Sequence, residues 1–512
     1  MRKTSVWVVA IITGLTLLTA WRIVSGSGKT AGNRATADSS KYERDILPEI
    51  LSLNKDGLTS PAKNFRTGHV TDAKLKDYFE KTDYGFCIKL PKQTNIPTPA
   101  VLNGTVYLSG GFGSKQYYAF DALTGDKKWG INLDDDGPSS PAIEDNVIVF
   151  NTESCTIFGC DLITGRMIWS YWLGDPLMSM PTIAGGIVFT AYPSFYPGIT
   201  QITSKDTADL FKIRPTHVLI AIEIKTGKIL WQKWIDSDVM SAPVAKDDLL
   251  YVTTFSGALY KIKQKSGEIL EAKSIRATSA PVFSANNDLI VSQRSDDSKD
   301  SLASESLSFG FNTSKKQLYK KRADYLDKKI QETSKLKSTS LHMDAGNGFA
   351  SGAPANSNWS AGYYNIGQSN VSSLQSFQGS RSLYRDGRLY NTMGDEIICT
   401  DSSGNTIWKH ALSGDMKNEG GFMGTPPVYA NGHIIVATFT GDVLIMDEKK
   451  GDIIKKYEIK DPVRYQPVVD KGWIYVTTVN GKMHAINTGN PAITGWNMWG
   501  GNAARTNMSS VN

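Results

Sequence analysis

The chain has 512 residues, of which 40% are hydrophobic and 21% are charged. Lys and Arg number 56 against 50 Asp and Glu, and this formal net charge of +6 is too weak to indicate a nucleic-acid partner. The 46 Gly, 12 Trp and 21 Tyr favour many strands and tight turns and argue against a helical bundle.

The first apolar segment lies at the N-terminus. Residues 4–21 carry no charge and follow Arg2 and Lys3, which predicts a signal anchor or transmembrane helix over residues 1–24. The alternative is a cleaved signal peptide, although the residues after the apolar run form a poor cleavage site. Residues 25–83 are interpreted as a tether and leader segment, because their first part is small and polar.

A repeated block makes up most of the remaining chain. Residues 139–173, 241–275 and 424–459 share the same order of a Pro, short apolar runs and turns that contain Gly. Four short runs with a period of about 40 residues are typical of a propeller blade of four antiparallel strands. Counting the turns predicts an all-β, eight-bladed propeller over residues 84–500, followed by a C-terminal tail over residues 501–512.

The blade motif contains a turn that ends in Gly and, in several blades, a Trp four residues later. Gly supplies the positive φ that such a turn requires. A Trp ring at the start of the last strand can lie between neighbouring blades and bury about 150–250 Å². These structural positions are Gly125, Gly165, Gly227 and Gly404 with Trp129, Trp169, Trp231 and Trp408.

Residues 84–90 resemble the last strand of a blade but have no blade of their own. We expect this segment to complete the final blade and so to join the two ends of the ring. The alternative is a leader strand that packs on the outside.

One insert, at about residues 323–376, interrupts the repeat. Its first part has the charge alternation of an amphipathic helix, and the part that follows is rich in Ser, Gly and Asn. Long loops in compact folds are usually functional or disordered, so Trp359, Tyr363 and Tyr364 are candidate partner-binding residues. The alternative is a loop that packs Trp359 against the neighbouring blades.

The motif A-x-D-x-x-T-G-x-x-x-W at residues 119–129, with its weaker copies, resembles the PQQ-like β-propeller repeat family. The resemblance covers about residues 84–500 and implies the propeller fold. One branch of this family contains quinoprotein dehydrogenases that bind pyrroloquinoline quinone and calcium. Another contains non-catalytic scaffolds of the outer-membrane barrel-assembly machinery. From this branch together with the predicted signal anchor, we expect a bacterial cell envelope location, with the anchor in the inner membrane and the propeller in the periplasm.

The dehydrogenase branch typically has a disulfide between adjacent cysteines, which this chain lacks. Its cysteines are Cys87, Cys155, Cys160 and Cys399. The His residues show no metal-ligand spacing, and Glu153, Glu396 and Glu419 are scattered among turns. We therefore expect no catalytic, cofactor-binding or metal-binding residues, and a scaffold that binds an envelope protein or polymer. A quinone-dependent dehydrogenase or another propeller enzyme is the alternative.

Overall fold

The computed structural model describes residues 43–55, 63–66, 70–153, 156–173, 179–194, 215–284, 286–296, 303–310, 319–322, 382–392, 395–414 and 423–508. Met1–Asp38 and Ser39–Asn512 form separate compact units. The predicted anchor and the insert, with its expected helix, lie outside the described residues. Within the described ranges the helix is α1 (Leu47–Leu53), and no helix there has the length and apolar character needed to cross a bilayer.

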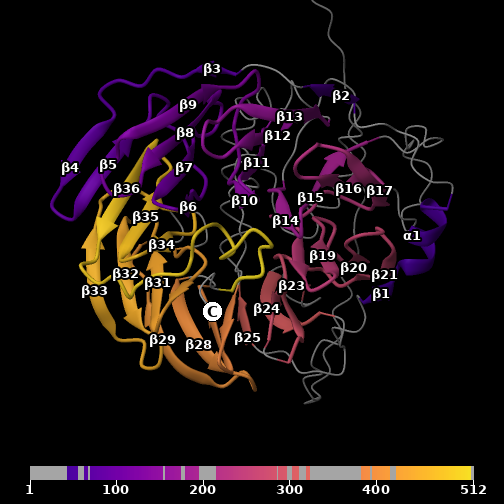
Figure 1. Cartoon of the computed structure of the whole chain (residues 1–512). Coiled ribbons are helices and arrows are strands. Elements are labelled where there is room, and N and C mark those ends of the chain that lie inside the picture. The colour runs from indigo at the N-terminus through magenta and orange to yellow at the C-terminus, as the bar shows by residue number, and fades with distance from the viewer. Residues whose placement is uncertain are drawn as a thin grey trace, which may run out of the picture. The chain divides into compact units, whose positions relative to one another are not determined.

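The described strands form eight antiparallel sheets, which are arranged around a common centre (Figure 1). The innermost strands are short, and all but β26 (Leu383–Arg385) begin directly after a Pro, as at Pro141 and Pro181, where a missing N–H costs least. Their neighbours are buried on both faces, because each sheet packs against another on either side; β11 is an example, with all of its residues buried.

The sheets in the first half of the ring are built as follows, with each outermost strand given last. They are β6 (Ala100–Leu102), β7 (Thr105–Ser109), β8 (Gln116–Asp121), β9 (Lys127–Asn132) and β3 (Thr71–Asp72); β10 (Ala142–Glu144), β11 (Val147–Asn151), β12 (Thr156–Asp161), β13 (Met167–Trp172) and β2 (Lys63–Arg66); β14 (Thr182–Ala184), β15 (Ile187–Pro193), β16 (His217–Glu223) and β17 (Ile229–Ile235); and β18 (Val244–Lys246), β19 (Leu249–Thr253), β20 (Ala258–Lys263), β21 (Ile269–Ser274) and β1 (Arg44–Asp45).

The remaining sheets follow the same order from the inside outwards. They are β22 (Val282–Phe283), β23 (Leu289–Asp296), β24 (Ala303–Phe309) and β25 (Tyr319–Arg322); β26 (Leu383–Arg385), β27 (Arg388–Asn391), β28 (Glu396–Asp401) and β29 (Thr406–Ala411); β30 (Val428–Ala430), β31 (His433–Ala437), β32 (Asp442–Asp447) and β33 (Ile453–Glu458); and β34 (Val468–Asp470), β35 (Trp473–Thr477), β36 (Lys482–Asn487), β5 (Gly85–Lys89) and β4 (Phe79–Thr82).

The fold class predicted from the sequence, eight uniform four-stranded blades with a transmembrane helix and a helical insert, is wrong as stated. Four of the sheets contain five strands. The described part of the chain also holds no helix suited to a membrane. The extra strands escaped prediction because they are short, and a segment of two to four residues shows no periodicity. The corrected class is an all-β propeller whose blades have four or five strands.

The ends of the ring are joined in the last sheet. β5 pairs antiparallel with β36 from Lys89↔Lys482 to Gly85↔Ile486, and β4 pairs with the outer side of β5. The expectation that residues 84–90 pair with the C-terminal end of the ring is therefore confirmed.

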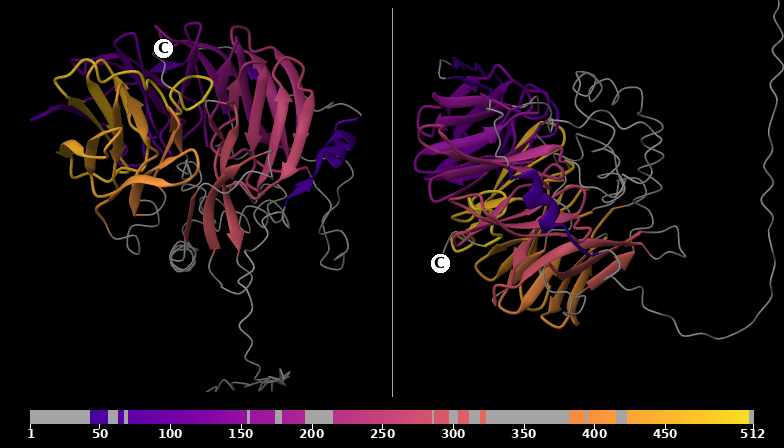
Figure 2. Two further views of the ribbon diagram at one scale, coloured as in Figure 1. Left: turned by 90° about the horizontal axis from the view of Figure 1, so that it is seen from below. Right: turned by 90° about the vertical axis from the view of Figure 1, so that its right-hand side faces the viewer.

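The N-terminal belt, which we define as the described residues from 43 to 82, runs along the outside of the ring. Its strands β1, β2, β3 and β4 add to the outer edges of β21, β13, β9 and β5. α1 lies on the outer side beside β21 and β17 (Figure 2). Asn54, at the end of α1, exchanges two hydrogen bonds with the backbone of Trp234 in β17, at 2.8 and 3.1 Å.

In four blades, a Trp at the start of the last strand connects the sheet to the next one. The Trp169 indole donates to the Ile224 carbonyl at 2.6 Å, and the Trp231 indole donates to the Gln264 carbonyl at 2.7 Å. Trp408 donates to the Glu448 carbonyl at 3.2 Å in the same way. The ring of Trp408 lies over Gly451, where a side chain would overlap it.

The C-terminal segment, residues 496–508, crosses the centre of the ring (Figure 1). Its backbone accepts hydrogen bonds from inner strands of several blades, including from Val101 of β6 and Ile183 of β14. Arg505 is fully buried there and donates to the carbonyls of Pro141, Pro181 and Trp499 at 2.7–3.1 Å. One planar side chain thereby fixes two inner strands and its own segment.

Substitution of Gly451 tests the Trp contact. Gly451 and Gly489 have nearly the same φ, 75° and 76°, but only Gly451 faces a ring; a Cβ at Gly489 meets nothing within 4 Å. We expect Gly489→Ala to cost about 1–2 kcal/mol through backbone strain alone. Gly451→Ala should cost about 1–3 kcal/mol more, because Trp408 must move. Chemical denaturation of the two variants measures the difference, and equal losses would contradict this account of the contact.

Candidate functional site

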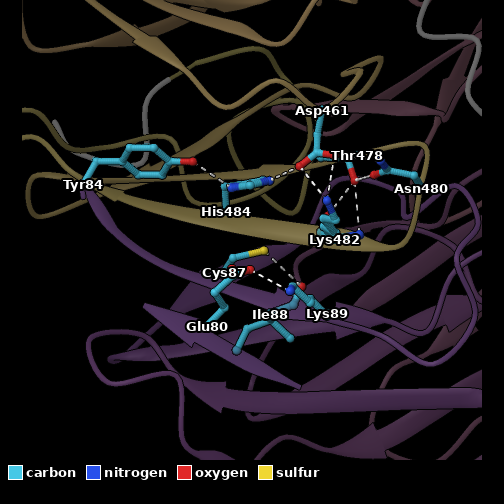
Figure 3. Close-up of polar contacts among 10 residues, drawn as sticks. All are labelled: Glu80, Tyr84, Cys87, Ile88, Lys89, Asp461, Thr478, Asn480, Lys482 and His484. Carbon is cyan, nitrogen blue, oxygen red and sulfur yellow. Dashed lines mark hydrogen bonds and ion pairs between the residues drawn. The ribbon is translucent and has the colours of Figure 1, made fainter. Parts of the chain in front are cut away.

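A buried polar cluster lies where the last sheet meets the preceding one (Figure 3). Asp461, in the loop between β33 and β34, accepts from Asn480 at 2.7 Å and from Lys482 at 2.9 and 3.1 Å. His484 Nε2 lies 2.8 Å from Asp461 Oδ2, and His484 Nδ1 lies 3.0 Å from the hydroxyl of Tyr84. We call Tyr84, Asp461, Asn480, Lys482 and His484 the closing cluster.

The closing cluster joins segments that are distant in the sequence. His484 and Lys482 are on β36, whereas Tyr84 is in the turn between β4 and β5. The ring of Tyr84 also meets that of Tyr457 on β33 edge-on, with centroids 6.1 Å apart. The cluster therefore ties the N-terminal strands to the last sheet and to its neighbour.

Opposing effects determine the charge of this cluster. Burial raises the pKa of Asp461, but hydrogen bonds from His484, Asn480 and Lys482 outweigh it, so the pKa lies well below its usual value. Burial raises the pKa of Tyr84 to about 12. Asp461 is therefore ionised and Tyr84 protonated at neutral pH.

A second acid occupies the same place between two other sheets. Asp236, after β17, accepts from Tyr260 Oη at 2.6 Å and Thr254 Oγ1 at 3.2 Å, and also from Ser256. Burial raises the pKa of Asp236, and hydrogen bonds from Ser256, Tyr260 and Thr254 only partly offset this rise. Tyr260 and His484 each lie six residues after the Thr that begins the turn, so they are equivalent positions.

The turn itself recurs. Thr254, Thr438 and Thr478 each begin a Thr-x-Ser/Thr/Asn-Gly turn and accept, through Oγ1, a hydrogen bond from the backbone N–H four residues later at 3.0–3.2 Å. The preceding loop supplies Asp236, Ser413 or Asp461 to each turn, and in every case the contact crosses from one blade to the next. This repetition indicates that the closing cluster holds blades together.

The chemistry of the cluster fits this structural role. His484 is 4% exposed, and its two ring nitrogens contact Asp461 and Tyr84. Tyr84 is a weak nucleophile because its hydroxyl stays protonated. The arrangement orders a seam and neutralises a buried carboxylate.

The cysteines among the described residues are buried, and Glu153 is partly buried. Burial raises the pKa of the Cys87 thiol to about 12 and that of Cys399 to about 11, and the thiol pKa of Cys160 rises further. Burial also raises the pKa of Glu153 to about 9. Cys155 and Glu419 lie outside the described residues. In the described ranges, no group of three or more His, Cys, Asp or Glu residues could hold a metal ion.

The predicted site residues are distributed as follows. Trp129, Trp169, Trp231 and Trp408 lie between neighbouring sheets, each with its indole bonded to a carbonyl of the next blade. Gly125, Gly165, Gly227 and Gly404 have φ between 71° and 87°. Trp359, Tyr363 and Tyr364 lie outside the described residues.

The closing cluster was not predicted from the sequence, because Asp461 and His484 belong to no recognisable motif. The available signal was the Thr-x-Ser/Thr/Asn-Gly turn, which recurs at Thr254, Thr438 and Thr478.

The N-terminal belt covers only part of the outer surface of the ring. The belt covers the outer strands of four sheets, and α1 contacts a fifth at β17. Among the described strands, none pairs with the outer edges of β17, β25, β29 and β33. Ile407 on β29 is 43% exposed, and Ile453 and Ile454 on β33 are 39% and 56% exposed. Unpaired edges with exposed apolar residues mark this part of the ring as a candidate contact surface.

Comparison with known proteins gives a family match along most of the ring. A family model described as outer membrane protein assembly factor BamB matches residues 86–192, 198–298, 357–454 and 394–497. Outer membrane protein assembly factor BamB of Yersinia pestis is 23% identical over 225 residues, which cover 38% of this chain and 52% of that protein.

Two further proteins are similar to this chain. Tetrathionate hydrolase of Acidithiobacillus ferrooxidans is 22% identical over 163 residues, covering 31% of this chain and 32% of the hydrolase. The chain thus spans about half of one of these two curated relatives and about a third of the other. The structure of Saccharomyces cerevisiae Sqt1 aligns with a TM-score of 0.50 and 9% identity, over 78% of this chain and 97% of that one. This last likeness concerns the fold alone.

The pKa directions at the two equivalent acids predict opposite pH dependences. The pKa of Asp461 in the folded protein is below the unfolded value of about 3.9. The ionised side chain therefore contributes fully to the free energy of unfolding above about pH 3.9, and this contribution is lost as the pH falls through the folded pKa. Asp461→Asn should therefore cost about 2–4 kcal/mol at pH 7, and less as the pH falls below about 4.

The folded pKa of Asp236 is raised, so the wild-type protein should instead lose stability relative to Asp236→Asn as the pH rises above about 4. Unfolding midpoints of both variants and the wild type from pH 3 to pH 8 measure the two slopes. Slopes of the same sign would contradict the assigned charges.

Proposed function

The chain belongs to the PQQ-like β-propeller repeat family, whose matching model is described as outer membrane protein assembly factor BamB. On this basis we propose that the chain is a non-catalytic scaffold that binds other proteins of the bacterial cell envelope. The observation that carries the proposal is that the most enzyme-like group of side chains, Tyr84, His484 and Asp461, is buried between two blades and repeats a structural contact found at Asp236. A rigid ring with open outer edges is suited to holding partners in fixed positions.

Two regions of the chain supply binding surface in this proposal. One is the outer side of β29 and β33, whose edges pair with no strand in the described ranges. The other is the insert at about residues 323–376, whose aromatics Trp359, Tyr363 and Tyr364 are of the residue type that dominates binding energy at interfaces. The similarity to the outer membrane protein assembly factor BamB of Yersinia pestis supports envelope proteins as the partners.

Catalysis is the second candidate, because the chain is also 22% identical to a tetrathionate hydrolase over part of its length. Purified protein incubated with tetrathionate, or with pyrroloquinoline quinone, calcium, an alcohol and an artificial electron acceptor that reoxidises the quinone, tests this candidate directly. Turnover in either assay would favour the enzyme over the scaffold.

The insert aromatics provide the mutational test of the scaffold. Trp359→Ala, Tyr363→Ala and Tyr364→Ala combined should weaken capture of crosslinked envelope partners at least about tenfold, because aromatic anchors at interfaces each contribute about 2 kcal/mol or more. The unfolding midpoint should not change. Ile163→Ser is the matched control, since Ile163 is 73% exposed in a turn far from the insert in the sequence.

Crosslinking in cells followed by mass spectrometry identifies the partners and their yield. Capture by the triple variant at the wild-type level would remove the insert from the proposal. Absence of any specific partner for the wild-type chain would overturn the scaffold itself.

A further inference from the structure

The belt shows which ligand the outer edges of this ring accept. Each of its four strands adds antiparallel to the outermost strand of a blade, with two to four residues in register. In two cases an aromatic side chain of the added strand packs on a ring of the blade: Phe65 on Tyr171 with centroids 5.1 Å apart, and Phe79 on Phe86 at 5.7 Å. The edges therefore bind short extended segments, and in two of the four cases the segment brings an aromatic side chain to the blade.

The outer edge of β33 has the same architecture without an added strand among the described residues. Five of its six residues are exposed, whereas β13, which β2 covers, has one exposed residue. Since alternate residues of an edge strand direct their N–H and C=O groups outwards, β33 offers a row of backbone groups for pairing. Ile453 and Ile454 place apolar surface beside that row.

The charges around β33 specify the ligand further. Between Lys449 and Lys460 the chain carries five Lys, at 449, 450, 455, 456 and 460, against two acids, Asp452 and Glu458. The acids on either side, Glu448 and Asp461, are half-buried and buried. Lys456 bridges Asp442 and Glu458 at 3.1 Å each, while Lys455 lies over the Tyr457 ring, 4.8 Å from its centroid. The edge as a whole is basic, so an acidic segment is the complementary ligand.

We propose that the outer edge of β33 docks an extended segment of a partner protein by antiparallel strand addition, and that this segment alternates apolar with acidic residues. Its backbone continues the sheet β30–β33, its apolar side chains contact Ile453 and Ile454, and its acidic side chains lie near Lys449, Lys450 and Lys455. The inference rests on the proposed scaffold function and specifies how that scaffold holds a partner.

A defined peptide tests the edge without any unidentified partner. The probe is a labelled nine-residue peptide in which Glu alternates with Phe and Val, and two comparison peptides replace either Glu by Lys or the central residues by Pro. Fluorescence anisotropy with the full chain should show binding of the acidic peptide only, since Pro removes the backbone donors and Lys removes the charge complementarity. Hydrogen exchange of the β33 amides should slow at least tenfold at saturation.

A matched pair of variants locates the site. Ile454→Asp should weaken binding of the acidic peptide at least tenfold, whereas Ile407→Asp on another open edge, β29, should leave it unchanged; both side chains are exposed, so both variants should fold. The proposal is overturned if the Pro peptide binds equally well, if protection falls outside β33, or if Ile454→Asp binds as the wild type does. If the acidic peptide does not bind at β33 while envelope partners are still captured in cells, the edge proposal fails and the scaffold function stands; absence of any specific capture by the wild type would end both.

Discussion

The pairing of β5 with β36 is the interaction on which the rest of this structure depends. Each sheet buries both faces against its neighbours, so an open ring would expose two apolar faces at once. The chain avoids this by placing a strand from its N-terminal part into the C-terminal sheet, and Tyr84 and His484, 400 residues apart, then meet across the join. Because of this closure, neither end of the described ring can detach without exposing the core of the other.

The contacts between blades repeat in outline and differ in chemistry. Asp236 and Asp461 occupy the same place relative to their turns. Asp236 accepts hydrogen bonds from three hydroxyl groups, whereas Asp461 contacts a Lys and a His. Burial therefore prevails at Asp236 and raises its pKa, whereas charge-assisted hydrogen bonds prevail at Asp461 and lower it. The more strongly bonded of the two acids lies at the closure, where separate parts of the chain must be held together.

The belt gives the ring two kinds of outer surface. Where β1 to β4 are added, the edges are satisfied and the outer strands are mostly buried or half-buried. At β33 the side chains remain exposed, and no strand of the described residues pairs with the outer edge, which carries apolar and basic side chains. A scaffold needs both, a part that fixes its own shape and a part that remains available to other proteins.

The sequence by itself determined the repeat, the turns and the closure. Period-two apolar runs, Gly at positions with positive φ, and the orphan strand at residues 84–90 are local patterns, and they indicated the propeller family correctly. Only the tertiary structure decided the number of strands in each blade, since residues 43–82, expected to be tether and leader, supply outer strands through backbone hydrogen bonds that any sequence can make. The same holds for Asp461 with His484 and for Arg505 with Pro141, because a polar contact between distant segments depends on how the sheets are placed in space, which no local pattern records.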